Sequence, residues 1–138
     1  MNLTVTTLPY NTLLGIQPAA EPPALQLPAD PQYLNHLGTV HAGALLSLAE
    51  AATGEFLLTH LGGTTGLIPV VRRMEAKFRK PAHGALTAKA TLPVDSLTQL
   101  TNDLASRGRA LVTVNVDVHD ESGTHALSAG VEWFIQKT

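Results

Sequence analysis

Residues 35–54 read Asn35-His-Leu-Gly-Thr-Val-His-Ala-Gly-Ala-Leu-Leu-Ser-Leu-Ala-Glu-Ala-Ala-Thr-Gly54. A polar turn punctuated by glycine leads straight into an apolar segment. We expect a helix over about residues 41–60, which begins at His41 or Ala42 and stops where Gly62 and Gly63 follow. We expect the rest of the chain to pack around this helix.

The expected helix is apolar around more than half of its circumference. At about 100° per residue, one face carries Leu45, Leu48, Ala49, Ala52 and Phe56. A second stripe beside it carries Leu46, Glu50, Thr53 and Leu57. A helix with so broad an apolar surface has to be covered by other structure, and we expect a sheet to wrap it.

Glu50 is a carboxylate on this otherwise apolar stripe. Burying an ionised carboxylate without a partner is costly, and the group shifts its pKa instead, which makes Glu50 a candidate for chemistry. The alternative is a charge that reaches solvent at the helix edge. Glu55, about 140° further around the helix, serves as the comparison, and we expect it to be structural.

The composition bounds the class of protein. The chain has 138 residues, enough for one domain with a real core, and we treat residues 1–138 as a single domain. Charged residues make up 14%, against about 25% in a typical soluble protein, so we expect another copy of the chain to cover part of the surface. The net charge of −2 gives no reason to expect a nucleic acid partner.

Residue usage also bears on which types of site the chain can form. The chain has no cysteine, which excludes a disulfide framework and thiolate chemistry. The histidines are scattered without metal-ligand spacing, so we expect no metal. The N-terminus lacks the features of a signal peptide, and no apolar run is long enough to span a bilayer, so we expect a cytoplasmic protein without a membrane partner.

The pattern around the helix predicts an α+β fold. Before the helix, a helical turn at residues 9–16 ends at Gly15, and short edge strands are open at 16–19 and 24–27. After it, four strands in antiparallel succession are expected at 67–78, 85–92, 109–119 and 125–135, the last two joined by a hairpin turn at 120–123. Residues 96–106 are open between a short helix and a loop. One helix packed on an antiparallel sheet follows.

Basic residues are unevenly distributed. Residues 1–71 contain no Lys or Arg, whereas five of the nine basic residues fall within 72–80. A cluster of this kind either meets an anionic ligand or forms a solvated strand edge that blocks aggregation.

The chain resembles a hotdog-fold acyl-CoA thioesterase over roughly residues 14–134. The resemblance is to the phenylacetate-degradation branch and its relative, the Arthrobacter-type 4-hydroxybenzoyl-CoA thioesterase. It rests on Asn35, on Gly38-Thr39-Val40-His41-Ala42-Gly43 and on Glu50, nine residues after the histidine. The segments 78–84 and 120–123 resemble the family's strand end and last hairpin. The resemblance implies an antiparallel sheet wrapped around one long central helix.

It also implies a site built across a dimer interface. Thioester hydrolysis needs a base or nucleophile near the carbonyl carbon and donors for the oxyanion. By resemblance, the N–H of Ala42 or Gly43 at the helix start polarises the carbonyl, with Ala42 standing where the family has glycine. Glu50 of the other protomer acts as general base or as nucleophile, and the sequence does not separate these roles.

Four further assignments accompany this site. Asn35 either caps a turn or supports the thioester, and His41 either holds the turn to the helix or supports the site; by resemblance both support it. Thr53 is placed to touch the Glu50 carboxylate or to position water. The basic residues expected to bind coenzyme A phosphates are, in order of preference, Arg79 and Lys80, then Arg72 and Arg73.

The leading interpretation is a homo-oligomeric acyl-CoA thioesterase, a homodimer or a homotetramer built as a dimer of dimers. It needs no cofactor, because coenzyme A belongs to the substrate. The alternative is a non-catalytic hotdog module that binds acyl-CoA or a related ligand. A hotdog dehydratase or hydratase is the third class, and its motif contexts are not seen in this sequence.

Overall fold

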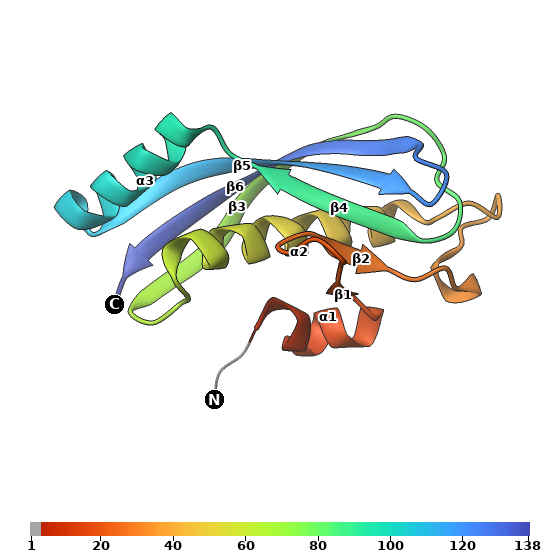
Figure 1. The fold of residues 1–138 in the computed structure, drawn as a ribbon, viewed down its shortest axis with the longest axis horizontal. Helices are drawn as coiled ribbons and strands as arrows, with labels where there is room; N and C mark the ends of the chain where they lie inside the picture. The colour runs from red at the N-terminus through yellow and green to blue at the C-terminus, as the bar shows by residue number, and fades with distance from the viewer. Residues whose placement is uncertain (1–3) are drawn as a thin grey trace.

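The structure is a computed structural model that describes residues 4–138. The chain begins with a short 3-10 helix and a short α-helix and ends in two long strands (Figure 1). In order, the elements are η1 (Val5–Thr7), α1 (Pro9–Leu14), β1 (Gln17–Pro18), β2 (Leu25–Leu27), η2 (Pro31–Tyr33), α2 (Ala42–Leu61), β3 (Leu67–Phe78), β4 (Leu86–Thr91), α3 (Val94–Arg107), β5 (Arg109–Asp120) and β6 (His125–Lys137).

The helix α2 matches the prediction closely. It runs from Ala42 to Leu61, and Gly62 ends it in the left-handed conformation at φ 74°. The face predicted to be covered is buried along its whole length, from Leu45 to Phe56. The helical turn before it is also confirmed, since α1 ends at Gly15 with φ 82°.

Six strands form one antiparallel sheet in the order β1-β2-β4-β5-β6-β3. The helix α2 lies across one face of this sheet, which we call the inner face, and α1 lies on the far side of α2 (Figure 1). The two short strands open in the sequence are present as β1 and β2 at one edge. The predicted α+β architecture is confirmed.

The expected succession of neighbouring strands is wrong at one place. β3 does not lie next to β4 but pairs with β6 at the opposite edge of the sheet. The tight β5–β6 hairpin occupies the middle, and residues 79–85 cross its end. Two hydrogen bonds hold this crossing, from Arg79 N to Ala126 O (2.8 Å) and from His83 N to Asp120 Oδ2 (3.0 Å).

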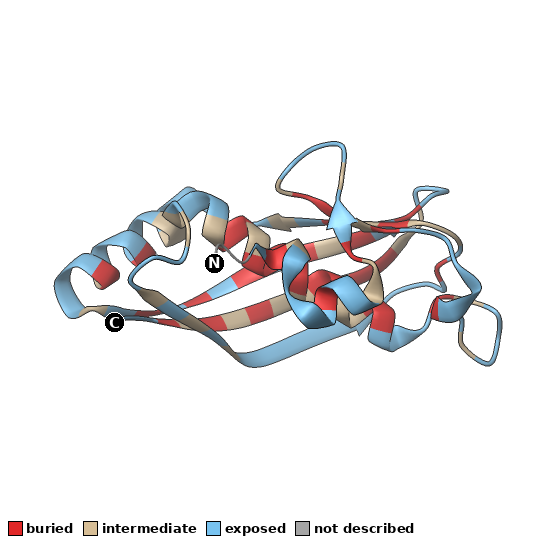
Figure 2. Cartoon of the chain, turned by 90° about the horizontal axis from the view of Figure 1, so that it is seen from below, coloured by how far each residue is buried: buried red, intermediate tan, exposed pale blue. Residues whose placement is uncertain are grey.

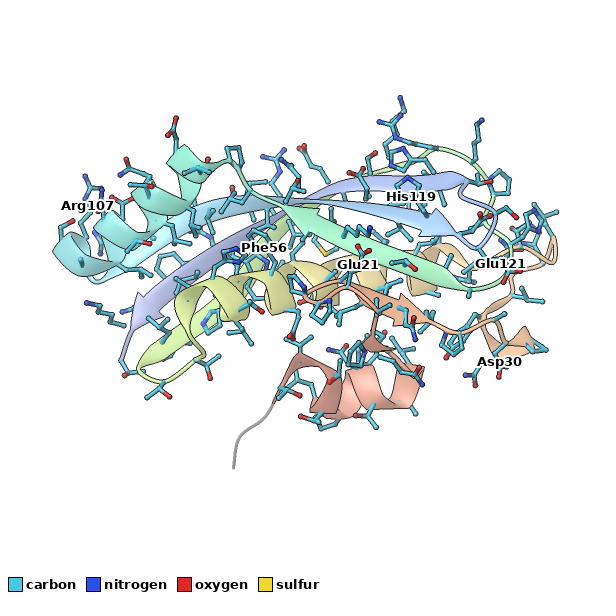
Figure 3. The ribbon with its side chains drawn as sticks, viewed as in Figure 1. Glu21, Asp30, Phe56, Arg107, His119 and Glu121 are labelled. Atoms are coloured by element: carbon cyan, nitrogen blue, oxygen red, sulfur yellow. The ribbon has the colours of Figure 1, made fainter. Side chains whose placement is uncertain are left out.

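The segment open between helix and loop is a helix, α3. Its Leu100 and Leu104 are buried, because β4 pairs only with the second half of β5 and α3 packs beside the first half. The end of α3 at Arg107 lies at the opposite end of the molecule from Glu121 in the β5–β6 turn (Figure 3).

Strict alternation along β5 builds the core. Every second residue from Ala110 to Asp120 is buried, and the residues between them are mostly exposed on the outer face, away from α2. Figure 2 shows these buried and exposed bands along the strands. β6 places Trp133 and Ile135 on the inner face, against α2. Within residues 4–138, the helices lack the combination of length and hydropathy that a transmembrane span requires.

Candidate functional site

Asn35 holds the turn that precedes α2. Its Oδ1 accepts hydrogen bonds from the amides of Leu37 (2.9 Å) and Thr39 (3.1 Å), and its Nδ2 donates to Thr39 Oγ1 (2.9 Å). Asn35 therefore caps this turn, and its role in supporting the thioester stays a prediction. A fixed turn also fixes the direction in which the first amides of α2 point.

His41 is the N-cap of α2. Its Nδ1 accepts a hydrogen bond from Gly43 N (2.8 Å), and its own amide donates to Tyr33 O (2.7 Å). A Cβ on residue 43 would lie 3.2 Å from His41 Nδ1, so glycine at this position lets the imidazole fold back over the helix end. With Nδ1 accepting, a neutral His41 carries its proton on Nε2.

The His41 cap engages only one of the two predicted oxyanion donors. The N–H of Gly43 is already engaged by His41, whereas the N–H of Ala42 has no acceptor within residues 4–138. Ala42 is exposed and stands at the positive end of the α2 dipole. Ala42 is therefore the donor that remains for an anionic or polarised oxygen.

Glu50 lies eight residues after Ala42 on the same helix. Its side chain lines a cavity of about 510 Å³. The cavity is closed by α2, by β3 and β6 of the sheet, and by the segment that begins with η1. It is lined by Thr4, Val5, Leu8, Glu50, Gly54, Leu57, Leu58, Leu61, Thr64, Leu67, Pro69, Val70, Val71, Trp133 and Ile135. The volume lies in the range of small-molecule sites.

Burial raises the pKa of the half-buried Glu50 carboxyl above its ordinary value of 4.5. Desolvation disfavours the charged form, and no cation or hydrogen-bond donor within residues 4–138 offsets it. A carboxylate with a raised pKa beside an apolar cavity has the properties of a general base. Burial also raises the pKa of Glu55, but Glu55 does not line this cavity.

Thr53 does not make the predicted contact with the Glu50 carboxylate. Its hydroxyl donates to the backbone carbonyl of Glu50 (2.8 Å) and accepts from Trp133 Nε1 (2.9 Å). Thr53 is fully buried, so both hydrogen-bonding roles of the hydroxyl are taken up inside the protein. What Thr53 does is to hold the indole of Trp133 against α2, where the ring forms part of the cavity wall.

The predicted phosphate-binding residues do not converge on Glu50 within one chain. The Arg72 guanidinium lies 5.8 Å from the centre of the Phe134 ring, and Arg79 Nε donates to Ser128 Oγ (2.6 Å). Phe134 and Ser128 alternate with buried residues of β6, so both contacts lie on the outer face of the sheet. Arg73 forms an exposed ion pair with Glu75. Lys80 is exposed just beyond the end of β3.

Ala42 and Glu50 also do not meet within one chain. Eight residues at 1.5 Å per residue separate them by about 12 Å along the helix. The candidate site of one chain therefore contains the carboxylate and the cavity, and the free amide of the same chain points elsewhere. Within residues 4–138, no three acidic or histidine residues lie close enough to form a metal site.

Sequence reasoning missed two parts of the cavity, Trp133 and the N-terminal residues Val5 and Leu8. Trp133, the one tryptophan of the chain, has a signal in its alternation with outward residues of the last strand. The small residues Ala51, Ala52 and Gly54 indicate from sequence that a strand or an acyl chain approaches the helix closely, and Gly54 lines the cavity. The contribution of Val5 and Leu8 had no local signal, because it depends on how the N-terminal segment folds back on α2.

Comparisons with known proteins place this geometry in a family. A family model described as a domain of unknown function (DUF4442) matches residues 17–135. No curated protein matches the sequence. A Pseudomonas aeruginosa protein described as a protein of unknown function and probable thioesterase is 25% identical, with a TM-score of 0.81 over 100% of this chain and 99% of the other.

Two further structures extend this likeness. A Haemophilus influenzae thioesterase is 20% identical, with a TM-score of 0.71 over 96% of this chain and 86% of the other. A Bacillus halodurans protein solved with CoA is 20% identical, with a TM-score of 0.69 over 91% of this chain and 74% of the other. The predicted hotdog fold is confirmed, while the phenylacetate and 4-hydroxybenzoyl-CoA branch stays a prediction.

Proposed function

The chain belongs to the DUF4442 family, and from this premise we propose that it hydrolyses an acyl-CoA thioester to the free acid and coenzyme A. The observation that carries the proposal is the Glu50 carboxyl, which burial leaves with a raised pKa at the edge of an apolar cavity. Two structural neighbours described as a thioesterase and as a CoA complex support the substrate class.

In the proposed reaction, Glu50 acts on the thioester carbonyl carbon either through water or directly. As a general base it takes a proton from water, whose oxygen forms the new bond to carbon while the sulfur of coenzyme A leaves. As a nucleophile it forms a mixed anhydride that water then hydrolyses. Both routes develop negative charge on the carbonyl oxygen, and the free N–H of Ala42 is the proposed donor to it.

The proposed active unit is a homodimer, because Ala42 and Glu50 of one chain lie about 12 Å apart along the helix. β3 is an edge strand with one side open among the described residues, and it exposes large apolar side chains. Ile68 and Phe78 are 52% and 50% exposed, and Leu37 at the tip of the turn before α2 is 74% exposed. A second copy that covers such surfaces brings its own Ala42 to this chain's Glu50.

A thiol-release screen over short, medium, long and aromatic acyl-CoAs tests the proposal. The native chain is expected to release coenzyme A, and Glu50→Gln is expected to lose at least a hundredfold in kcat, the contribution typical of a general base. Glu55→Gln is the matched control, since it makes the same change on the same helix outside the cavity. A Glu50→Gln variant as active as native protein would refute the assignment.

The alternative proposal, a non-catalytic module that binds acyl-CoA, is favoured by one feature. His41 takes up the Gly43 amide, so the helix start offers a single free donor in place of two. Under this alternative the native chain binds acyl-CoA, releases no thiol from any member of the screen, and binds equally well as Glu50→Gln.

A further inference from the structure

The cavity beside Glu50 is long and follows one helix. The α2 residues that line it are Glu50, Gly54, Leu57, Leu58 and Leu61, which lie on one face at helical spacing. From the first to the last of them the helix rises about 16 Å at 1.5 Å per residue. A volume of about 510 Å³ extended over this length describes a narrow channel rather than a round pocket.

Apart from Glu50, the channel lining is apolar except for Thr4 and Thr64. Past Glu50, the α2 wall carries glycine and leucine, and the sheet wall carries only apolar residues from β3 and β6. The one indole N–H in this wall, on Trp133, is already bonded to Thr53 Oγ1. Along these two walls, a hydroxyl or charge on a bound group would lose its hydrogen bonds to water without replacement.

Gly54 opens the channel directly behind Glu50. A Cβ on this residue would lie 3.5 Å from the Trp133 ring and 3.8 Å from Val5 Cγ2, both ordinary contacts. Packing therefore does not require glycine here, and glycine in a helix interior carries a cost relative to alanine. What glycine provides is space, one turn along the helix from the carboxylate.

We infer that the channel binds the straight aliphatic chain of a medium- or long-chain acyl-CoA, with Gly54 as a specificity-determining residue. An extended alkyl chain matches the length and the lining, whereas an aromatic acyl group fills only the first part. Placing the thioester at Glu50 rests on the proposed function. Binding of the alkyl chain itself needs no hydrolysis and is measured separately.

Titration calorimetry on Glu50→Gln protein, in which turnover is expected to be at least a hundredfold slower, measures this binding. Butanoyl-, octanoyl-, dodecanoyl- and phenylacetyl-CoA are the ligands. Burial of methylenes predicts a gain in affinity of roughly tenfold for every two added, and phenylacetyl-CoA is expected to bind as weakly as butanoyl-CoA. Affinity independent of chain length, or phenylacetyl-CoA bound tighter than dodecanoyl-CoA, overturns the assignment.

Two substitutions at different depths locate the chain. Added to the Glu50→Gln protein, Gly54→Leu is expected to lower dodecanoyl-CoA affinity at least tenfold and to change butanoyl-CoA affinity less than twofold. Leu61→Trp, at the far end, is expected to weaken dodecanoyl-CoA alone. Thr59→Leu adds similar bulk at an exposed position of α2 outside the channel and is expected to change neither.

Thermal unfolding shows which variants are folded, and if Gly54→Leu unfolds, Leu61→Trp carries the test. Folded variants at both positions that bind dodecanoyl-CoA as before overturn the channel assignment. Native protein that releases no thiol, yet binds with the expected chain-length dependence, refutes hydrolysis and supports the channel. Native protein that hydrolyses phenylacetyl-CoA faster than dodecanoyl-CoA supports hydrolysis and refutes the channel assignment.

Discussion

Glu50 on α2 and Asp120 at the end of β5 are both carboxylates set into the protein, yet their surroundings act in opposite directions. Asp120 is 7% exposed, and three backbone amides donate to it at 2.9–3.0 Å. Burial alone raises the pKa of Asp120, but these hydrogen bonds outweigh burial and hold the pKa below its ordinary value of 3.8. Burial acts unopposed on Glu50 and raises its pKa.

The difference separates a structural carboxylate from a reactive one. Asp120 accepts from His83, on the crossing after β3, and from Ser122 and Thr124 in the β5–β6 turn, so its charge joins two segments of chain. Glu50 has no such partner within residues 4–138, and its charge is the less stable form. A carboxylate kept in that condition beside a cavity is available to take a proton or to attack a carbonyl.

The largest expected effect is on the pH dependence of thiol release. Because the base is the ionised form of Glu50, kcat/KM is expected to fall tenfold per pH unit below the pKa of Glu50, and burial places this acidic limb above pH 4.5. Asp120, with its lowered pKa, stays ionised throughout the range. Rate measurements from pH 5 to pH 8 with the best acyl-CoA provide the profile.

Two variants assign this limb to its residue. Glu55→Gln is expected to retain it, and the residual activity of Glu50→Gln is expected to lack it. An acidic limb that persists in Glu50→Gln would show that another group titrates. The raised pKa of Glu50 would then not explain catalysis.

The next effect concerns Asp120→Asn, which is expected to destabilise the fold by about 2 kcal/mol. An asparagine oxygen still accepts from two amides, but its NH2 group then faces the His83 N–H, donor against donor. Since the folded pKa of Asp120 is lowered, its contribution is present above pH 3.8 and is lost as pH falls through the folded pKa. Urea unfolding at neutral and at acidic pH measures both the loss and its disappearance.

Asn115→Asp is a useful comparison, because it changes charge on an exposed outer position of the same strand. It is expected to alter the free energy of unfolding by less than about 0.5 kcal/mol. Equal stability of native and Asp120→Asn protein at neutral pH would contradict the role of Asp120 in joining the crossing after β3 to the β5–β6 turn.

The sequence predicts the position of Glu50 better than the surroundings of Asp120. Helical spacing and the motif around His41 identified α2 and Glu50, because both signals are local. The turn at residues 120–123 was also predicted, but the bond from His83 to Asp120 spans 37 residues and has no local signal. The same limit explains why the sequence predicts neither the pairing of β3 with β6 nor the hydrogen bond between Thr53 and Trp133, 80 residues away.

A third effect, of smaller size, is a gain in stability from Glu50→Gln. Ionised Glu50 costs stability because its folded pKa is raised, so the native chain is favoured below pH 4.5 and loses stability as pH rises through the folded pKa. Glutamine removes this cost, and a gain of about 0.5–2 kcal/mol is expected at neutral pH. Unfolding of both proteins at pH 4 and pH 7 should show the gain only at pH 7; a loss of stability at pH 7 would indicate that the charge has a partner.

The smallest expected effects are changes in stability on replacing one glycine near Glu50 and one near Asp120. Gly54 beside Glu50 has ordinary helical geometry and room for a Cβ, so Gly54→Ala is expected to raise stability by up to about 1 kcal/mol, the difference in helix propensity. Gly84 beside the Asp120 hairpin has φ +78°, and a Cβ there would overlap the Glu121 carboxylate, so Gly84→Ala is expected to lower stability. Thermal unfolding of the two variants compares a glycine retained for space with one retained for backbone conformation. A loss of stability in Gly54→Ala would mean that the fold itself needs glycine beside Trp133, and chain-length preference would then have to originate elsewhere in the channel.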